Sequence, residues 1–166
     1  MPSNDVCVSS WTNEPLSLGF VHRRAERSSH MNECIFCQIV QGDAKSWKVY
    51  EDNATYAFLD VNPFSEYHTL VIPKTHYADV FELPKAQLME VMRTVKAVVS
   101  LYETKLGLRN VHIYNSSGAD AQQDVFHVHF HVVPRSAGDG QDLSRATHPE
   151  FRERFDEMLA QLAPTT

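Results

Sequence analysis

The most constraining feature of this chain is the segment from Phe126 to Arg135, in which histidines alternate with apolar residues. Successive side chains of a β-strand point to opposite faces of its sheet. A strand over this segment therefore places His127, His129 and His131 on one face, while the apolar residues between them face a hydrophobic core. The alternation predicts a half-buried strand whose polar face carries three imidazoles.

Three neighbouring imidazoles have a distinctive chemistry. Protonated rings repel one another, so they titrate as a coupled set in which at least one ring stays neutral near pH 7. A neutral imidazole is a nucleophile, and a protonated one is an acid. Two alternatives stay open at this point: a polar face that is histidine by chance, and a metal site. Alternate residues on a strand are about 7 Å apart at their Cα atoms, so two of the rings can share a metal readily and three only with strain.

The remaining elements predict an α+β fold. Helical spacing of apolar residues indicates helices over residues 34–40, 84–106 and 149–162. Strand-like runs occupy residues 47–51, 55–60, 68–73, 110–115 and 125–134, and the first two are joined in a hairpin at Asp52 and Asn53. Five strands in hairpin-like order with segregated helices indicate a five-stranded, mainly antiparallel sheet with one long helix and short flanking helices.

Residues 1–30 differ from the rest of the chain. They are rich in Ser, Arg and Asn and show no sustained hydrophobic period, which is typical of a flexible extension. An organelle-targeting peptide stays open as a second interpretation, although Asp5, Glu14 and Glu26 weaken it because such peptides avoid acidic residues. We therefore expect a flexible extension over residues 1–30 and a single domain over residues 31–166, ending in the helix over 149–162.

Composition narrows the classes of function. The chain has 166 residues, 43% of them hydrophobic, which suffices for one domain with a core. Its net charge of −6 argues against a nucleic-acid partner, although one pocket can still hold a small phosphorylated ligand. No stretch approaches the ~20 apolar residues of a membrane span, and the first residues lack the layout of a secretory signal. We expect a soluble cytoplasmic protein with no membrane partner.

Two of the three cysteines, Cys34 and Cys37, are separated by two residues. Three cysteines are too few for a disulfide framework. The two-residue gap is typical of half of a structural zinc site, which needs two further ligands to complete a tetrahedron. A redox dithiol and a pair of buried, unpaired thiols are the alternatives.

Together these motifs resemble the histidine triad family of nucleotide hydrolases and transferases. The family signature, His-x-His-x-His-x-x with apolar x, is matched at every position of residues 127–133. Further matches are CIFCQI at 34–39, FLDVNP at 58–63, HTLVIPK at 68–74, and Gln123. The resemblance covers about residues 32–135, in the order that the family has them.

The resemblance implies an enzyme that hydrolyses purine nucleoside phosphoramidates, of the adenosine 5'-monophosphoramidase type, through a covalent nucleotidyl-histidine. It implies that His129 is the nucleophile, that His131 and His68 act on the phosphate side, and that Gln123 orients the leaving group. His127 completes the implied catalytic group. Diadenosine polyphosphate hydrolysis, and a nucleotide sensor or scaffold whose turnover is incidental, are the alternative functions.

The same resemblance implies the nucleotide contacts. Asp60 accepts hydrogen bonds from ribose hydroxyls, and apolar walls surround the base. The implied contacts are Phe36, Ile39, Phe58, Asp60, Val61, Asn115, Gln123, His129 and His131. For the apolar members of this set, packing in the core is the commoner role. Asp124 departs from the family pattern, since some relatives have Ser there near the phosphate, and an added negative charge disfavours an anionic substrate unless it faces away.

Zinc and a homodimer are also implied. The ligand set would be Cys34, Cys37, His76 and His127, a closed site that makes the ion structural and leaves no open catalytic position. If zinc binds, His127 is a neutral ligand and cannot also supply protons.

The helix over 84–106 carries a second apolar stripe, Met89, Met92 and Val99, which exceeds what one sheet face can cover, and relatives pair through this helix.

Overall fold

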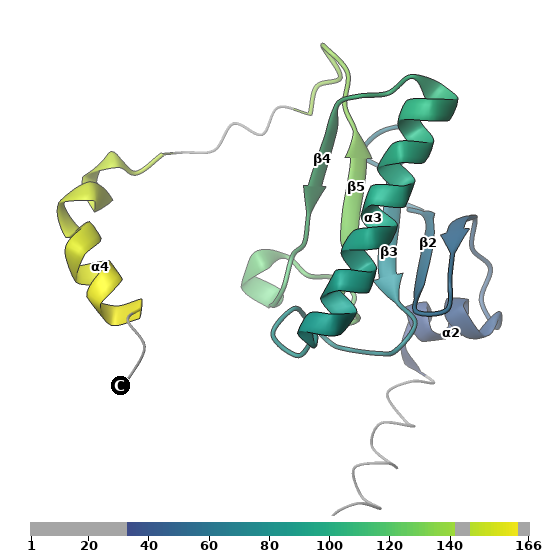
Figure 1. Ribbon diagram of the computed structural model, residues 1–166, viewed down its shortest axis with the longest axis horizontal. Helices are drawn as coiled ribbons and strands as arrows, with labels where there is room; N and C mark the ends of the chain where they lie inside the picture. The colour runs from purple at the N-terminus through teal and green to yellow at the C-terminus, as the bar shows by residue number, and fades with distance from the viewer. Residues whose placement is uncertain (1–32, 142–146, 163–166) are drawn as a thin grey trace, which may run out of the picture. The chain divides into compact units, whose positions relative to one another are not determined.

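The computed structural model describes residues 33–141 and 147–162 (Figure 1). The chain divides into two compact units, one ending at Arg135 and the other beginning at Ser136. The single domain over 31–166 therefore stays a prediction, and the extension over 1–30 lies outside the described residues. No helix within the described ranges is both long enough and apolar enough to cross a membrane.

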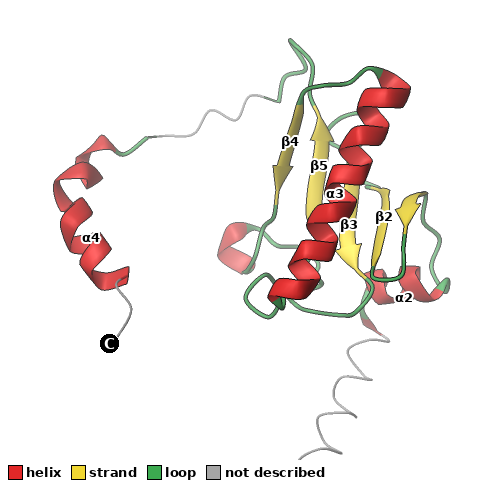
Figure 2. Ribbon diagram, viewed as in Figure 1, coloured by secondary structure: helices red, strands yellow, loops and turns green. Residues whose placement is uncertain are grey.

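The first unit is built on a five-stranded sheet (Figure 2). Its strands are β1 (Lys48–Glu51), β2 (Thr55–Leu59), β3 (Thr69–Pro73), β4 (Val111–Tyr114) and β5 (Phe130–Pro134). Their order across the sheet is β1-β2-β3-β5-β4, and every neighbouring pair is antiparallel. The described part of this unit also contains the α-helices α2 (Ile35–Gln41) and α3 (Lys85–Leu106) and the short 3-10 helix η1 (Ala119–Ala121). The predicted α+β fold is confirmed.

The long helix α3 covers one face of the sheet (Figures 1 and 2). The core on this side is made of Val91, Val95, Val98 and Tyr102 from the helix and Ala57, Val71 and Val132 from the strands. Ala57 is paired with Val71, and Val132 is paired with Thr69, two residues before Val71, so the three side chains point to the same face. The helix ends at Gly107, whose φ of 68° is the left-handed conformation that a glycine C-cap adopts readily.

Helix α2 packs against the opposite face. Phe36 and Ile39 meet the alternate residues of β2 and β3 in a second core, completed by Tyr56, Phe58, Leu70 and Ile72. His131 of β5 lies on this face as well, because it is paired with Leu70 on one side and with Tyr114 of β4 on the other. The functional side chains therefore gather on the sheet face that α2 covers in part.

The structure corrects the extent of the histidine strand. Strand β5 begins at Phe130, five residues after the start predicted at 125, and its pairing with β3 ends at Val71 and Phe130. Pro73, the last residue of β3, has no N–H with which to continue the ladder. The N–H of Val128 instead donates to the carbonyl oxygen of Tyr77, at 2.7 Å. His127 and His129 thus precede the strand, whereas the predicted ends of the other strands agree within one residue.

The second unit contains η2 (Pro149–Arg154) and α4 (Phe155–Leu162). The predicted helix over 149–162 is therefore present, but its first six residues form a 3-10 helix. Its apolar side chains, Phe151, Phe155, Met158, Leu159 and Leu162, are exposed. Neither of these two helices has a buried residue.

Candidate active site

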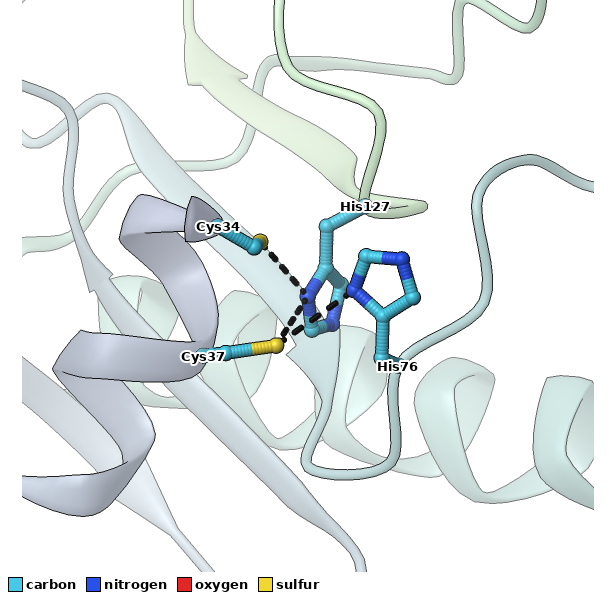
Figure 3. A group of neighbouring side chains, drawn as sticks. All are labelled: Cys34, Cys37, His76 and His127. Atoms are coloured by element: carbon cyan, nitrogen blue, oxygen red, sulfur yellow. Dashed lines mark hydrogen bonds between the residues drawn. The ribbon is translucent and has the colours of Figure 1, made fainter. Parts of the chain in front are cut away.

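Four predicted metal ligands from separate parts of the chain converge at the start of α2 (Figure 3). Their ligand atoms, two Sγ and one ring nitrogen from each histidine, all lie within 4.8 Å of one another. Nδ1 of His127 is 3.5 Å from Sγ of Cys34 and 3.6 Å from Sγ of Cys37. Nδ1 of His76 is 3.4 Å from Sγ of Cys37. Cys34, Cys37, His76 and His127 hence form one cluster, as predicted.

The tautomer of His127 suits a metal. Nε2 of His127 is 2.9 Å from the carbonyl oxygen of Pro73, and a carbonyl can only accept, so this nitrogen carries the proton. The lone pair on Nδ1 then faces the two thiols. Burial lowers the pKa of His127 to about 4, so the ring is neutral. Burial raises the pKa of the Cys37 thiol to about 12, so zinc would have to displace the proton of this thiol when it binds. Two sulfurs and two imidazole nitrogens are the donor set of a tetrahedral zinc site, so the residues fit zinc.

The ring of His129 borders the pocket beside α2. Its Nδ1 is 2.8 Å from the carbonyl oxygen of His127, so Nδ1–H donates this bond and the neutral ring has its lone pair on Nε2. The side chain is only 2% exposed, and the ring of Phe36 meets it edge to face at 5.4 Å. The Nδ2–H of Asn115 donates to the carbonyl oxygen of His129 at 2.8 Å. Both the ring and the backbone of His129 are thereby fixed.

His68 and His131 form a hydrogen-bonded pair with a defined direction. The N–H of Phe64 donates to Nδ1 of His68 at 3.2 Å, so the proton of His68 is on Nε2 and is donated to Nδ1 of His131, at 3.0 Å. His131 must then carry its own proton on Nε2. Burial, with the neighbouring His129 and His68, lowers the pKa of His131 to about 3. His131 therefore offers a neutral N–H donor beside the lone pair of His129, with the two ring centroids 4.9 Å apart.

Asp60 lies next to this pair. Its Oδ2 is 3.6 Å from Nδ1 of His68, and its Oδ1 accepts the N–H of Asn62 at 2.8 Å. Burial lowers the pKa of His68, an effect that Asp60 partly opposes. Ligand atoms of Asp60, His68 and His131 lie within 4.8 Å of one another. Both ring nitrogens of His68 and Nδ1 of His131 already take part in hydrogen bonds, so a metal would have to displace these bonds.

A pocket of about 270 Å³ opens between α2, the end of β2 and the histidines. Its lining is Ile35, Phe36, Ile39, Lys45, Phe58, Asp60, Val61, Asn62, Leu70, Asp124, Val125, His129 and His131. Of the predicted nucleotide contacts, all but Asn115 and Gln123 are in this lining. Phe36, Ile39 and Phe58 belong to the second core as well, so they act both as core residues and as pocket walls.

Three predicted site residues are placed behind the pocket. Asn115 donates to the backbone of His129, as described above, and His127 is fully buried against the thiols. The side-chain amide of Gln123 donates to the carbonyl oxygens of Ala78 and Val125, at 2.7 and 3.0 Å, and accepts the N–H of Gly118 at 2.8 Å. The amide of Gln123 thus holds three backbone groups, and its predicted role in orienting the leaving group stays a prediction.

Two aromatic contacts were not foreseen. Tyr114 stacks on His131, with ring centroids 4.4 Å apart and an interplanar angle of 10°. Phe64 stacks on His68 at 5.2 Å. The pairing of β4 with β5 places Tyr114 opposite His131, so a correct strand register would have revealed the first contact. The second depends on the loop before His68, for which the sequence carries no comparable signal.

Fold and site together define a protein with three histidines at or near a partly apolar pocket and a Cys/His cluster beside them. Comparison with known proteins gives the family. Residues 41–138 match the HIT domain family. An uncharacterized HIT-like protein of Methanocaldococcus jannaschii is 45% identical over 65% of this chain and 83% of its own length. A Candida albicans protein named adenosine 5'-monophosphoramidase is 37% identical over 65% of this chain and 73% of its own length.

Solved structures agree with the sequence matches. The crystal structure of a Zn-bound histidine triad family protein from Mycobacterium smegmatis covers 80% of this chain and 96% of its own, with a TM-score of 0.64 and 36% identity. The chain therefore belongs to the histidine triad (HIT) family. Members of this family are generally nucleotide hydrolases and bind nucleotide substrates.

Proposed function

We propose that this protein hydrolyses purine nucleoside 5'-phosphoramidates, with an AMP-type nucleotidyl group carried covalently by His129. The observation that supports this most is the bond from Nδ1–H of His129 to the carbonyl oxygen of His127, because it leaves the Nε2 lone pair as the nucleophile. The name of the Candida albicans relative, adenosine 5'-monophosphoramidase, supports the choice of substrate class.

In the first step, Nε2 of His129 attacks the α-phosphorus. A new P–N bond forms, and the P–N bond to the leaving amine breaks with its electron pair staying on the amine nitrogen, which takes a proton from solvent. The Nε2–H of His131 donates to a phosphoryl oxygen and stabilises the charge that develops there. His68 keeps this donor in place, because the Nε2–H of His68 donates a hydrogen bond to Nδ1 of His131.

In the second step, water attacks the same phosphorus. The P–Nε2 bond breaks and its electron pair returns to the imidazole, while one proton of the water goes to solvent and the nucleoside monophosphate leaves. Throughout both steps Nδ1–H of His129 keeps its bond to the carbonyl of His127. The modified ring is therefore cationic, which makes it a good leaving group for the second displacement.

The pocket supplies the nucleoside contacts of this proposal. The Asp60 carboxylate is the acceptor for ribose hydroxyls, and its Oδ1 is already oriented by the N–H of Asn62. Phe36, Ile39 and Phe58 form the apolar wall for the base. Val61 lies in the pocket lining and is 71% exposed. Its apolar side chain is therefore not accounted for by packing in a core.

Zinc, held by Cys34, Cys37, His76 and His127, has a structural role in this account. When bound, it would cross-link the start of α2, the segment after β3 and the segment before β5. A closed set of four protein ligands leaves no position for substrate. What the cluster contributes to the reaction is therefore the placement of His127, whose carbonyl oxygen orients the nucleophile.

We further propose that two copies of the chain pair through α3. Met89 and Met92 of the predicted second stripe are 65% and 36% exposed. Val99, the third member of that stripe, packs in part against the first core, so the exposed stripe is narrower than predicted. Two methionines on an accessible helix face are an adaptable apolar contact surface.

A substrate panel tests the proposed activity. Adenosine and guanosine 5'-phosphoramidates would be compared with diadenosine polyphosphates, and kcat/KM measured for each. The proposal predicts the highest values for the phosphoramidates. Higher values for diadenosine polyphosphates would favour that alternative, and nucleotide binding without turnover of any substrate would favour a sensor or scaffold.

A further inference from the structure

A carboxylate lies beside the attacking nitrogen of the nucleophile. Oδ1 of Asp124 is 3.8 Å from Nε2 of His129, and the Asp124 side chain lines the pocket. This carboxylate is 82% exposed, so it meets whatever enters the pocket from solvent. The N–H of Val125 donates to the same Oδ1 at 2.9 Å and holds that oxygen in place. Asp124 therefore faces the reaction site rather than pointing away from it.

The neighbouring residue holds the backbone beside Asp124. The side chain of Gln123 is buried, and its amide is bonded to three backbone groups, of Ala78, Val125 and Gly118. One of these groups, the carbonyl of Val125, belongs to the residue that follows Asp124. The backbone on both sides of Asp124 is thereby held in place, even though the side chain itself is exposed.

Negative charges outnumber positive charges in the described pocket lining. Asp60 and Asp124 contribute two carboxylates to the described lining, and Lys45 is the one Lys or Arg in it. The ammonium of Lys45 lies 4.9 Å from the ring centre of Trp47. His131, which borders the reaction site, is neutral because its pKa is lowered to about 3. The charged group that lies next to Nε2 of His129 is therefore the negative carboxylate of Asp124.

The substrate must come close to this charge. For attack, the phosphorus has to lie about 3 to 3.5 Å from Nε2, which brings the phosphoryl group near Asp124 and the end of a flexible leaving group within its reach. A polyphosphate leaving group adds negative charges at this point, and each is repelled. An ammonium group is attracted instead.

We propose that Asp124 makes the enzyme prefer leaving groups that carry a positive charge, such as an aminoalkyl group on the phosphoramidate nitrogen. This inference rests on the proposed function and narrows its substrate class. The reaction is unchanged: Nε2 of His129 forms the new bond to phosphorus, and the aminoalkylamine departs with the electron pair of the broken P–N bond and takes a proton from solvent. Asp124 forms no bond to the substrate in either step.

Three matched substrates test the preference. They are adenosine 5'-phosphoramidates whose N-alkyl chain of two or three methylenes ends in an ammonium, a methyl or a carboxylate group. For the unmodified protein we expect kcat/KM to fall in that order, by about fivefold per unit charge, the factor that Coulomb's law gives for unit charges about 4 Å apart in water. Raising the salt concentration should reduce the differences, because the carboxylate is exposed.

Two variants show whether Asp124 is the cause. Asp124→Asn should remove most of the difference between the three substrates while the methyl-ended substrate is still hydrolysed. Asp120→Asn is the matched control, since it removes the same charge from an exposed residue of η1 that is not in the pocket lining. It should leave the order of the substrates unchanged.

The outcomes separate this inference from the function on which it rests. Hydrolysis of all three substrates with equal kcat/KM, or an order that Asp124→Asn leaves unaltered, would overturn the inference and leave phosphoramidate hydrolysis standing. No hydrolysis of any of the three would overturn both. A divalent cation bound at Asp124 would be a second source of positive charge near the pocket. Assays with 5 mM EDTA or with added Mg²⁺ test for it. If the carboxylate-ended substrate became the best one with Mg²⁺ and lost this advantage in EDTA, Asp124 would be binding a divalent cation, and the preference for a cationic leaving group would be wrong.

Discussion

The Nδ1–H of His129 donates to the carbonyl oxygen of His127 at 2.8 Å, and His127 in turn directs its own Nδ1 at two thiols. One residue thus belongs to the Cys/His cluster through its side chain and to the pocket through its backbone. The alternation of the triad makes this possible, because His127 and His129 are separated by one residue. A disturbance at the cluster should therefore reach the nucleophile through His127.

Metal binding gives the first prediction. We expect about one zinc ion per chain in protein purified without chelators, and Cys34→Ser should lower the melting temperature more than it lowers turnover per folded molecule. Cys7→Ser, at a position outside the described residues, is the control and should change neither quantity. Metal analysis that finds no zinc would contradict the prediction.

The second prediction concerns the oligomeric state. Static light scattering at micromolar concentration should give twice the mass of one chain. Met89→Glu, which places a charge on the exposed stripe of α3, should shift the mass toward that of one chain because an unpaired charge at an apolar contact is costly. A single-chain mass for the unmodified protein would rule out the dimer.

Acid should destabilise the protein through His131. Its pKa is about 3 in the folded state and about 6.5 when unfolded, so the unfolded state binds the additional proton at intermediate pH. Its contribution to stability is therefore complete above pH 6.5 and declines as the pH falls toward 3. Between pH 7 and pH 5 we expect the free energy of unfolding to fall by about 2 kcal/mol more for the unmodified protein than for His131→Asn.

Urea titrations of both proteins at the two pH values measure this difference. Effects of acid on the Cys/His cluster are common to the two proteins and cancel in the comparison. If the two free energies fell in parallel, burial of a neutral His131 would not be a source of acid sensitivity.

A fourth prediction addresses the role of Gln123. Gln123→Ala leaves one backbone N–H and two backbone carbonyls without their partner, which should cost about 1 to 3 kcal/mol of stability. Turnover should fall too, because the loop carries Asp124 and leads into the triad. Gln122→Ala, a change of the adjacent exposed side chain, should have a much smaller effect on the urea midpoint. Equal effects of the two changes would contradict the role in holding the loop.

Much of this architecture could be predicted from the sequence. Strand and helix positions follow from hydrophobic period and from stop signals such as Gly107. The spacing of Cys34 and Cys37 indicates half of a metal site without reference to the other two ligands. The ligands His76 and His127 came from the family resemblance. They lie 51 residues apart in the sequence, and only the antiparallel pairing of β3 with β5 brings their segments together.

What could not be predicted depends on local backbone geometry. The alternation of the triad indicates a strand as far back as residue 125, but Pro73 ends the ladder with β3 and the first two histidines leave the sheet. The proton positions on His129, His68 and His131 depend on which backbone groups face each ring. The inward position of Gln123 likewise depends on local turns at Gly118 and Val125 and on one contact distant in sequence, with Ala78.

The central claim is that Nε2 of His129 is the nucleophile, and turnover by His129→Asn tests it most directly. An Asn amide can still donate to the carbonyl of His127, so the substitution removes Nε2 with little disturbance of the surrounding bonds, and AMP should still bind in calorimetry. We predict that this variant folds, binds AMP and shows at least a thousandfold lower turnover of adenosine 5'-phosphoramidate, a loss of about 4 kcal/mol in transition-state stabilisation. Turnover within about tenfold of the unmodified protein, a difference of only ~1.4 kcal/mol, would show that His129 does not attack phosphorus.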